Sequence, residues 1–304
     1  MIWKKIGRIY NPGLSEIDWM SRHSMLPTVD HLKDDIFRVY CSGRDEKGRS
    51  LVGYVTFDLN KPKDIIEISK TPVLNCGKLG HFDDNGVTPS SIVNTNGKKY
   101  LYYIGWKPRS TTRFGLISGL SVSKDGGMSF DRIINSPILS TNNNEPISIL
   151  TAPFVMKMGD VWKMWYVSGV EWINADLPVY NIKYAESLDG INWNQTGHIC
   201  ISNRDKETAL ARPCVLFDGE IYKMWYGYKY NGNTYRIGYA ESSNGKDWKR
   251  LDEQAGIDVS ESGWDSEMIE YAYVFLHKDN TYMIYNGNEY GTSGFGLAIL
   301  ENIS

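Results

Sequence analysis

The sequence contains no block of basic residues, no long apolar run and no closely spaced pair of cysteines. Its 33 Lys and Arg residues are scattered and are outnumbered by 36 Asp and Glu residues. A nucleic-acid-binding surface normally shows as a basic stripe, so no nucleic-acid partner is expected. The opening stretch MIWKKIGRIYNPG carries basic residues with no apolar segment behind them. We therefore expect neither an export signal nor a membrane span, and we expect a cytoplasmic location.

Cysteine and histidine are also scarce. Cys41, Cys76, Cys200 and Cys214 lie far apart, and in a chain without an export signal they are expected to be free, buried thiols. The five histidines do not have the spacing of metal ligands, so neither a metal nor another cofactor is expected. No Gly-rich phosphate loop and no G-x-S-x-G motif occurs, which argues against P-loop and serine-hydrolase chemistry.

Aromatic residues, in contrast, make up 13% of the chain, and many of them recur at a fixed interval. Five apolar strands end in an aligned tyrosine, and these residues are Tyr40, Tyr103, Tyr166, Tyr226 and Tyr285. Successive tyrosines are 63, 63, 60 and 59 residues apart. A shorter strand precedes each of them and opens at Pro27, Pro89, Pro153, Pro213 or Ala272. Such self-similarity is the signature of a repeat architecture.

Each repeat continues into a third strand, and in the middle repeats a tight turn leads to a fourth. The turns are SKDGGMSF, SLDGINW and SSNGKDW, whose Asp-Gly and Asn-Gly pairs supply the positive φ that two-residue hairpins need. The aromatic residue after each turn (Phe130, Trp193, Trp248) is expected to cap the edge of its own unit. Five four-stranded antiparallel units predict an all-β chain, a single five-bladed β-propeller domain spanning residues 1–304.

The fifth repeat stops after its third strand, near Glu301. The N-terminal residues Trp3-Lys4-Lys5-Ile6 resemble the fourth strands that begin at Trp193 and Trp248. We therefore expect the N-terminal strand to complete the last blade, which would close the ring and remove two free sheet edges.

The strings MWY and YAES with a following Asp-Gly or Asn-Gly turn and Trp resemble the five-bladed glycosidase superfamily, which includes arabinanases, invertases and mannoside phosphorylases. The strings HFDDNGVTPSS and GWDSEMIEYAYV are similar to an uncharacterised branch found near bacterial surface-polysaccharide genes. The resemblance implies a funnel at one end of the propeller axis that binds a glycoside. Because a fold does not by itself define a reaction, the site needs its own argument.

The better-known relatives hold three carboxylates beside the strand-opening prolines of the first three blades. This sequence has Leu26 at the first place, Thr88 and Ser90 around the second, and Leu150 and Thr151 at the third. The relatives' catalytic residues therefore cannot be transferred to this chain, and a hydrolase of the usual type is in doubt.

Two sets of loops are expected to line the axial mouth. The loops that enter the innermost strands contain Arg22, His23, Asp83, Asp84, Glu207, Arg212, Asp265, Glu267 and Glu270. The loops between second and third strands contain Arg44, Asp45, Trp106, Arg109, Arg113, Glu171, Trp172, Tyr230, Glu289 and Tyr290. Carboxylates, arginines and aromatic rings together suit sugar recognition.

From these loops we predict a carbohydrate-active enzyme that hydrolyses, phosphorolyses or transfers a glycoside. Asp84, Glu267 and Glu270 are the candidate acid–base residues, with Asp84 and Glu267 facing each other. Arginine also binds phosphate or an acidic sugar, so an anion is expected near Arg22, His23 and Arg212. The predicted substrate-binding residues are Arg22, His23, Asp83, Trp106, Trp172, Arg212, Asp265 and Tyr290. A non-catalytic sugar-binding propeller and a protein-interaction scaffold are the alternatives, and for each acidic residue an ordinary solvated or turn-capping role also stays open.

Overall fold

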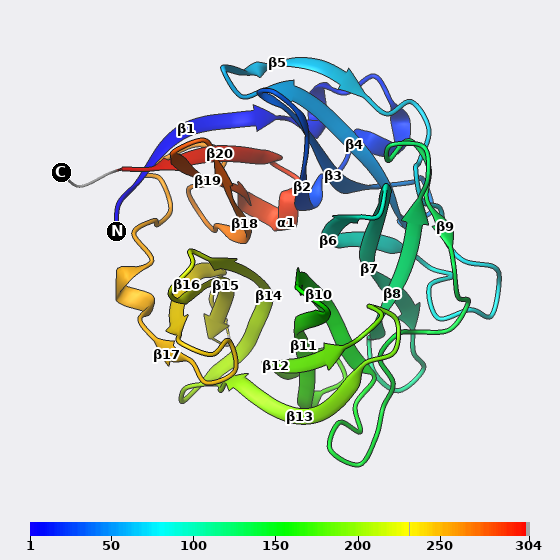
Figure 1. Ribbon diagram of the computed structural model, residues 1–304. Helices are drawn as coiled ribbons and strands as arrows, with labels where there is room; N and C mark the ends of the chain where they lie inside the picture. The colour runs from blue at the N-terminus through cyan, green and yellow to red at the C-terminus, as the bar shows by residue number, and fades with distance from the viewer. Residues whose placement is uncertain (231, 302–304) are drawn as a thin grey trace.

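The computed structural model describes residues 1–230 and 232–301, and its strands form five four-stranded antiparallel blades arranged around a central axis. Short parallel pairings of β8 with β10 and of β12 with β14 join blades 2, 3 and 4. Figure 1 looks down this axis and shows the innermost strands β2, β6, β10, β14 and β18 surrounding the centre. This arrangement confirms the predicted five-bladed, all-β propeller. No helix in the described part of the chain is long and apolar enough to cross a membrane.

The first three blades follow one another along the chain, each beginning at the axis. Blade 1 consists of β2 (Met25–Lys33), β3 (Ile36–Arg44), β4 (Ser50–Asp58) and β5 (Lys61–Ile68). Blade 2 consists of β6 (Val87–Thr95), β7 (Lys98–Pro108), β8 (Phe114–Ser123) and β9 (Asp131–Arg132). Blade 3 consists of β10 (Ile149–Met158), β11 (Val161–Asn174), β12 (Leu177–Ser187) and β13 (Asn194–Ile201).

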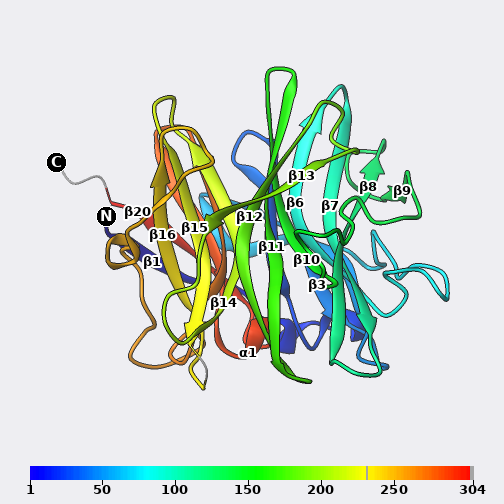
Figure 2. The same cartoon turned by 90° about the horizontal axis from the view of Figure 1, so that it is seen from below.

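The last two blades complete the ring. Blade 4 consists of β14 (Glu207–Phe217), β15 (Tyr222–Tyr230), β16 (Arg236–Ser242) and β17 (Lys249–Arg250). Blade 5 consists of β18 (Glu270–His277), β19 (Asn280–Asn286), β20 (Phe295–Leu300) and the N-terminal β1 (Trp3–Tyr10). The helical elements are η1 (Pro12–Leu14), η2 (Asp18–Met20), η3 (Asp252–Gln254) and α1 (Asn288–Gly291), and Figure 2 shows α1 at the lower end of the blades.

Neighbouring blades are joined by a repeated contact between an aromatic residue and the tight turn of the next blade. The Tyr40 hydroxyl donates to the Gly127 carbonyl at 3.0 Å, and the Tyr102 hydroxyl donates to the Gly190 carbonyl at 2.8 Å. Gly127 and Gly190 have φ of 90° and 74°, and a Cβ on either would lie within 3 Å of the tyrosine oxygen. Glycine is therefore needed both for the turn and for the close approach of the neighbouring blade.

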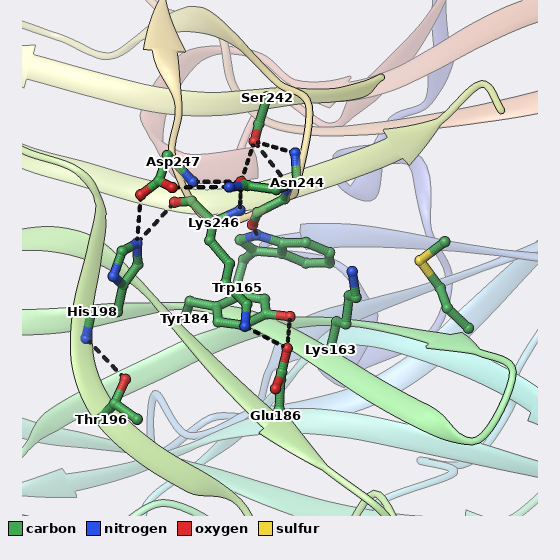
Figure 3. Close-up of polar contacts among 12 residues, drawn as sticks. Lys163, Trp165, Tyr184, Glu186, Thr196, His198, Ser242, Asn244, Lys246 and Asp247 are labelled. Atoms are coloured by element: carbon green, nitrogen blue, oxygen red, sulfur yellow. Dashed lines mark hydrogen bonds and ion pairs between the residues drawn. The ribbon is translucent and has the colours of Figure 1, made fainter. Parts of the chain in front are cut away.

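Figure 3 shows the same contact between blades 3 and 4, where the Trp165 indole N–H donates to the carbonyl of Gly245 at 2.7 Å. An ion pair beside it links Lys246 of blade 4 to Glu186 of blade 3 at 2.9 Å. The Glu186 carboxylate also accepts a hydrogen bond from the Tyr184 hydroxyl at 2.7 Å. The Asn-Gly turn thus positions its own blade against the preceding one as well as reversing the chain.

The aromatic residue after each turn packs on the preceding blade, which differs from the expected cap on its own blade. Phe130 lies edge-on to Tyr40 with ring centroids 5.4 Å apart, and Trp248 lies edge-on to Trp165 at 6.3 Å. The aromatic ring that follows the turn extends beyond the edge of its own blade. It therefore packs against apolar side chains of the neighbouring blade. In blades 2 and 4 the following strand is only two residues long, because its arginine turns inward to a buried carboxylate.

The N-terminal strand closes the ring as predicted. β1 pairs with β20, with Trp3 opposite Leu300. Trp3 is 5% exposed and lies edge-on to Trp225 of blade 4, with ring centroids 6.0 Å apart. This geometry repeats the contact between Trp248 and Trp165. The first residues of the chain therefore supply the last inter-blade contact of the ring.

Replacing Trp3 by alanine should destabilise the protein strongly, because it removes a buried indole at the point where the ring closes. We expect the free energy of unfolding to fall by about 3–5 kcal/mol, measured by urea denaturation. Ile2→Ala is the matched control, since Ile2 is 51% exposed and its loss should change stability by less than about 0.5 kcal/mol. Equal stabilities for the two variants would show that β1 does not hold the ring closed.

Candidate functional site

A pocket of about 250 Å³ opens at the propeller axis, and all five blades contribute side chains to it. Leu26 comes from blade 1, Trp106 from blade 2, Ala152 from blade 3, Lys229 from blade 4 and Tyr271 from blade 5. Convergence of several structural units on one concave, largely apolar space is typical of a small-molecule site. We define this space as the axial pocket.

The floor of the axial pocket is built from residues with left-handed backbone. Leu26 (φ 50°), Ala152 (φ 48°), Arg212 (φ 40°) and Tyr271 (φ 54°) lie inside the innermost strands, each directly before the proline or alanine expected to open its strand, and all four line the pocket. Each of these strands therefore begins earlier than the sequence predicted. The pairing register of the strand shifts at each of these places. Such a conformation costs a non-glycine residue on the order of 1–3 kcal/mol and tends to occur at functional sites. The bulge turns one side chain per blade toward the axis.

Arg212 lies at the axis and connects three other blades. One Nη donates to the carbonyls of Tyr271 and Ala272 in blade 5, at 2.6 and 3.3 Å. The other donates to the carbonyls of Pro27 and Ser90, in blades 1 and 2, at 3.0 Å each. Arg212 is 1% exposed, and burial lowers the pKa of its guanidinium. Both Nη atoms are engaged, whereas the Nε is buried without a partner in the described part of the chain. The structure therefore places Arg212 as a central cross-link, and its predicted contact with an anion stays a prediction.

Aromatic side chains form the walls of the axial pocket. The Trp106 indole N–H donates to the Thr88 hydroxyl at 3.0 Å, which fixes the ring beside Phe114. On the opposite side, Tyr290 stands edge-on to Tyr235 with ring centroids 6.1 Å apart. Tyr290 belongs to α1, where its φ of 56° is left-handed. Trp106 and Tyr290 both line the pocket, and their predicted contact with substrate stays a prediction.

Glu270 is buried behind the tyrosine wall. It is 0% exposed, and neither carboxyl oxygen has a hydrogen-bond partner in the described part of the chain. Burial raises the pKa of Glu270 well above its ordinary value, although the nearby Lys229 ammonium opposes this shift. The Glu270 charge in turn contributes to raising the pKa of Tyr271, Tyr235 and Tyr290, whose main cause is burial. The predicted acid thus lies next to pocket-lining residues and favours its protonated form.

Asp83 and Asp265 have a different role from the predicted contact with substrate, since each accepts a hydrogen bond from an aligned repeat tyrosine. The Tyr103 hydroxyl donates to Asp83, and the Tyr285 hydroxyl donates to Asp265, both at 2.9 Å. Arg132 pairs with Asp83 and Lys5 pairs with Asp265, both at 2.7 Å. Glu145 with Tyr166 and Asp252 with Tyr226 repeat the arrangement in blades 3 and 4. These carboxylates are therefore parts of the repeat that tie each outer strand to its blade.

Asp84 and Glu267 do not face each other across the axial pocket. Asp84 forms an ion pair with Lys107 at 2.7 Å and accepts from the Gly80 N–H, and these bonds hold its pKa below the usual range against the effect of burial. Glu267 is exposed, and its main-chain N–H donates to Asn288 at 2.8 Å. Neither residue lines the pocket. Equal offset from Pro89 and Ala272 did not bring them together, because these two positions lie inside β6 and β18 and do not mark the strand starts.

The three other predicted contacts, Arg22, His23 and Trp172, do not line the pocket. Arg22 is exposed. Burial, with smaller contributions from Arg44 and Arg22, lowers the pKa of His23 to about 4, so His23 is neutral at pH 7. Trp172 packs against Phe114 with ring centroids 5.6 Å apart and supports the wall from outside the pocket lining.

Sequence reasoning missed Lys229 and did not single out Arg44 and Arg113, all of which line the axial pocket. The repeat alignment could have identified Lys229 as a pocket residue. Lys229 follows its aligned tyrosine by three residues, as Trp106 does in blade 2. Within the described residues no three His, Cys, Asp or Glu side chains are grouped so as to hold a metal ion. Cys41, Cys200 and Cys214 are free and buried as expected, while Cys76 is only half-buried.

Solved structures with the same fold come from carbohydrate-active proteins. A complex of BT0996 with RGII superimposes with a TM-score of 0.77 at 17% identity, covering 99% of this chain and 93% of the other. A structure from the GH130 family, described as mannoside phosphorylases that include glycoside hydrolases of beta-1,2 mannosidic linkages, gives 0.70 at 15% identity, covering 100% and 91%. A thermostable family-43 glycoside hydrolase gives 0.69 at 15% identity, covering 92% and 90%. The protein therefore has the five-bladed propeller fold of glycoside hydrolases and phosphorylases.

Sequence comparison identifies the narrower group. The chain is 40% identical over 304 residues to the Uncharacterized protein MT1551 of Mycobacterium tuberculosis strain CDC 1551, covering 99% of this chain and 100% of the relative. It is 39% identical, with the same coverage, to a second uncharacterized protein from another strain of that species. The chain belongs to the family of these mycobacterial proteins. No protein-family model matches it.

The state of Glu270 predicts how stability depends on pH. Folding raises the pKa of Glu270, so above about pH 4.3, where an unfolded Glu loses its proton, the folded state holds one proton more than the unfolded state. Wild type should therefore lose stability relative to Glu270→Gln by about 1.4 kcal/mol per pH unit as pH rises from 4.3 toward the folded pKa. Urea denaturation of both proteins between pH 4 and 8 measures the difference. A difference independent of pH would mean that Glu270 is ionised in the folded protein.

Proposed function

We propose that the protein is a carbohydrate-active enzyme that acts on a glycoside in its axial pocket. The observation that carries the proposal is the combination of an aromatic-walled cavity with the fully buried acid Glu270 behind its wall. Aromatic rings pack against the apolar faces of sugar rings, and a carboxylic acid of raised pKa is the group that protonates a departing glycosidic oxygen. Relatives in fold that act on glycosides support the same class of substrate.

In this proposal the walls orient the sugar and Glu270 supplies the proton. Trp106 and Tyr290 stand at the mouth and present their rings to the ligand. Tyr271 lines the pocket and is a neighbour of Glu270. In this proposal its hydroxyl takes the Glu270 proton and passes its own to the glycosidic oxygen as the bond to the anomeric carbon breaks. The enclosed site keeps bulk water away from the acid, which preserves its raised pKa.

The second half of the reaction needs an acceptor that adds to the anomeric carbon and loses a proton. Water, phosphate or a sugar hydroxyl would give hydrolysis, phosphorolysis or transfer respectively. Asp176 is the one carboxylate that directly lines the described pocket, at the exposed tip between β11 and β12. We assign it as the base that receives the acceptor's proton. We place the reaction in the cytoplasm, in the metabolism of bacterial surface polysaccharide.

A non-catalytic sugar-binding propeller is the alternative. It is favoured by the side chains at the places where the resembled enzymes hold carboxylates, which here are Leu26, Thr88 and Thr151. With those groups replaced, the pocket would retain its aromatic walls and bind a sugar without cleaving it. The two functions differ in whether a product forms.

A screen of oligosaccharides and nitrophenyl glycosides, with and without phosphate and with products detected by mass spectrometry, tests the proposal. For any substrate found, Glu270→Gln should lower kcat by about 10²–10⁴, the usual contribution of a general acid. The wild-type rate should fall at high pH as Glu270 ionises, and this limb should be absent in Glu270→Gln. Glu267→Gln is the matched control, because Glu267 is exposed outside the pocket and its loss should leave kcat unchanged.

Two outcomes would contradict this function. If Glu267→Gln lowered kcat and Glu270→Gln did not, the catalytic acid would lie outside the axial pocket. If sugars bound equally to wild type and Glu270→Gln and no product formed, the protein would be the binding module.

A further inference from the structure

Three cationic side chains from three blade regions converge at the mouth of the axial pocket. Arg44 ends β3, Arg113 precedes β8, and Lys229 lies near the end of β15, and all three line the cavity. The Arg113 main-chain N–H donates to the Ala175 carbonyl at 2.8 Å, which fixes its loop against the blade 3 hairpin. Three positively charged side chains from segments distant in sequence therefore line the same cavity.

These three charges influence one another. Burial lowers the pKa of the Arg44 guanidinium, and the charge of Arg113 lowers it further. Burial likewise lowers the pKa of the Lys229 ammonium, where Glu270 opposes the shift and Arg113 adds to it. Arg113 thus lies close enough to repel both of the other cations, and the folded protein bears the cost of gathering like charges.

The charge of Glu270 opposes the pKa shift at Lys229, but no carboxylate pairs directly with any of the three cations in the part of the chain that the structure describes. In residues 1–230 and 232–301, none of the three cations makes a salt bridge. The Nε of Arg44 is buried and has no hydrogen-bond partner there, and its Nη2 faces the Met25 sulfur at 3.7 Å. The Lys229 ammonium lies over the Tyr235 ring at 4.9 Å. A buried donor normally has an acceptor, and the Nε of Arg44 lacks one, while the exposed Arg113 and the half-buried Lys229 bring two further unpaired charges to the same cavity. The arrangement therefore suits a ligand that supplies acceptors.

We propose that Arg44, Arg113 and Lys229 form an anion subsite that binds a carboxylate or phosphate group of the glycoside, or a phosphate acting with it. The inference rests on the proposed function and names the charge of its substrate. Arginine binds such groups through two parallel N–H donors, and Lys229 adds a point charge. The neighbouring Trp106 ring would hold the sugar that carries the group.

Isothermal titration calorimetry at low and physiological salt tests this subsite with D-glucuronate, D-glucose and inorganic phosphate. D-Glucuronate should bind wild type at least tenfold more tightly than D-glucose, and the advantage should shrink as salt rises. Arg113→Gln and Lys229→Met should each weaken D-glucuronate binding about tenfold and leave D-glucose binding unchanged. Arg109→Gln is the matched control, because Arg109 is an exposed arginine of the same β7–β8 loop that does not line the pocket.

The phosphate titration distinguishes the sources of the anionic group. If phosphate displaces D-glucuronate, the subsite binds an anionic group that the sugar itself carries. If phosphate instead raises the affinity for D-glucose, phosphate binds beside the sugar as a co-substrate. Equal affinity for D-glucuronate and D-glucose, or anion binding that survives both charge-removing variants, would overturn the subsite and leave the proposed function standing. Phosphate binding that depends on Arg113 and Lys229, without sugar binding or turnover, would support the subsite and refute the function.

Discussion

The structure depends on one buried cation, the guanidinium of Arg212 at the propeller axis. Its Nη atoms donate to main-chain oxygens of blades 1, 2 and 5, and Arg212 itself belongs to β14 of blade 4. A guanidinium has five donors in a rigid plane, so it can satisfy several carbonyls that converge at a point where no strand pairs with another. Without it, those carbonyls would be buried without donors, at a cost of about 1–3 kcal/mol each. The cross-link thereby gives the axial pocket a fixed floor.

The pocket above this floor follows from how each blade begins. A left-handed residue at a bulge in the innermost strand directs one side chain to the axis, and the sequence varies that residue from Leu26 to Ala152, Arg212 and Tyr271. The repeated hydrogen bonds and aromatic contacts between blades are left unchanged by this variation, because they lie farther from the axis. A rigid ring can therefore carry a different set of pocket residues, which explains how one propeller fold serves several reactions.

The repeat made the fold predictable from the sequence. Strand order, blade number and closure by Trp3 all follow from tyrosines spaced about sixty residues apart, because each strand has counterparts of similar sequence in the other repeats. The site was predicted only in part, since a pocket lies where the repeats differ and side-chain direction depends on local bulges. Trp106 and Tyr290 were found because the mouth loops are visible as interruptions of the pattern. Asp83 and Asp265 were misassigned because a buried carboxylate that binds a repeat tyrosine cannot be told from a loop acid without its partner.

The central claim is that the axial pocket binds a sugar by its aromatic walls and holds an anionic group at its mouth. A crystal structure of the protein with D-glucuronate tests it most directly. We expect the sugar ring of D-glucuronate to pack against Trp106 or Tyr290. Its carboxylate should lie within about 2.7–3.2 Å of N–H donors on Arg44, Arg113 or Lys229. A sugar bound on the outer edge of a blade or at the opposite end of the axis, with nothing at these cations, would contradict it.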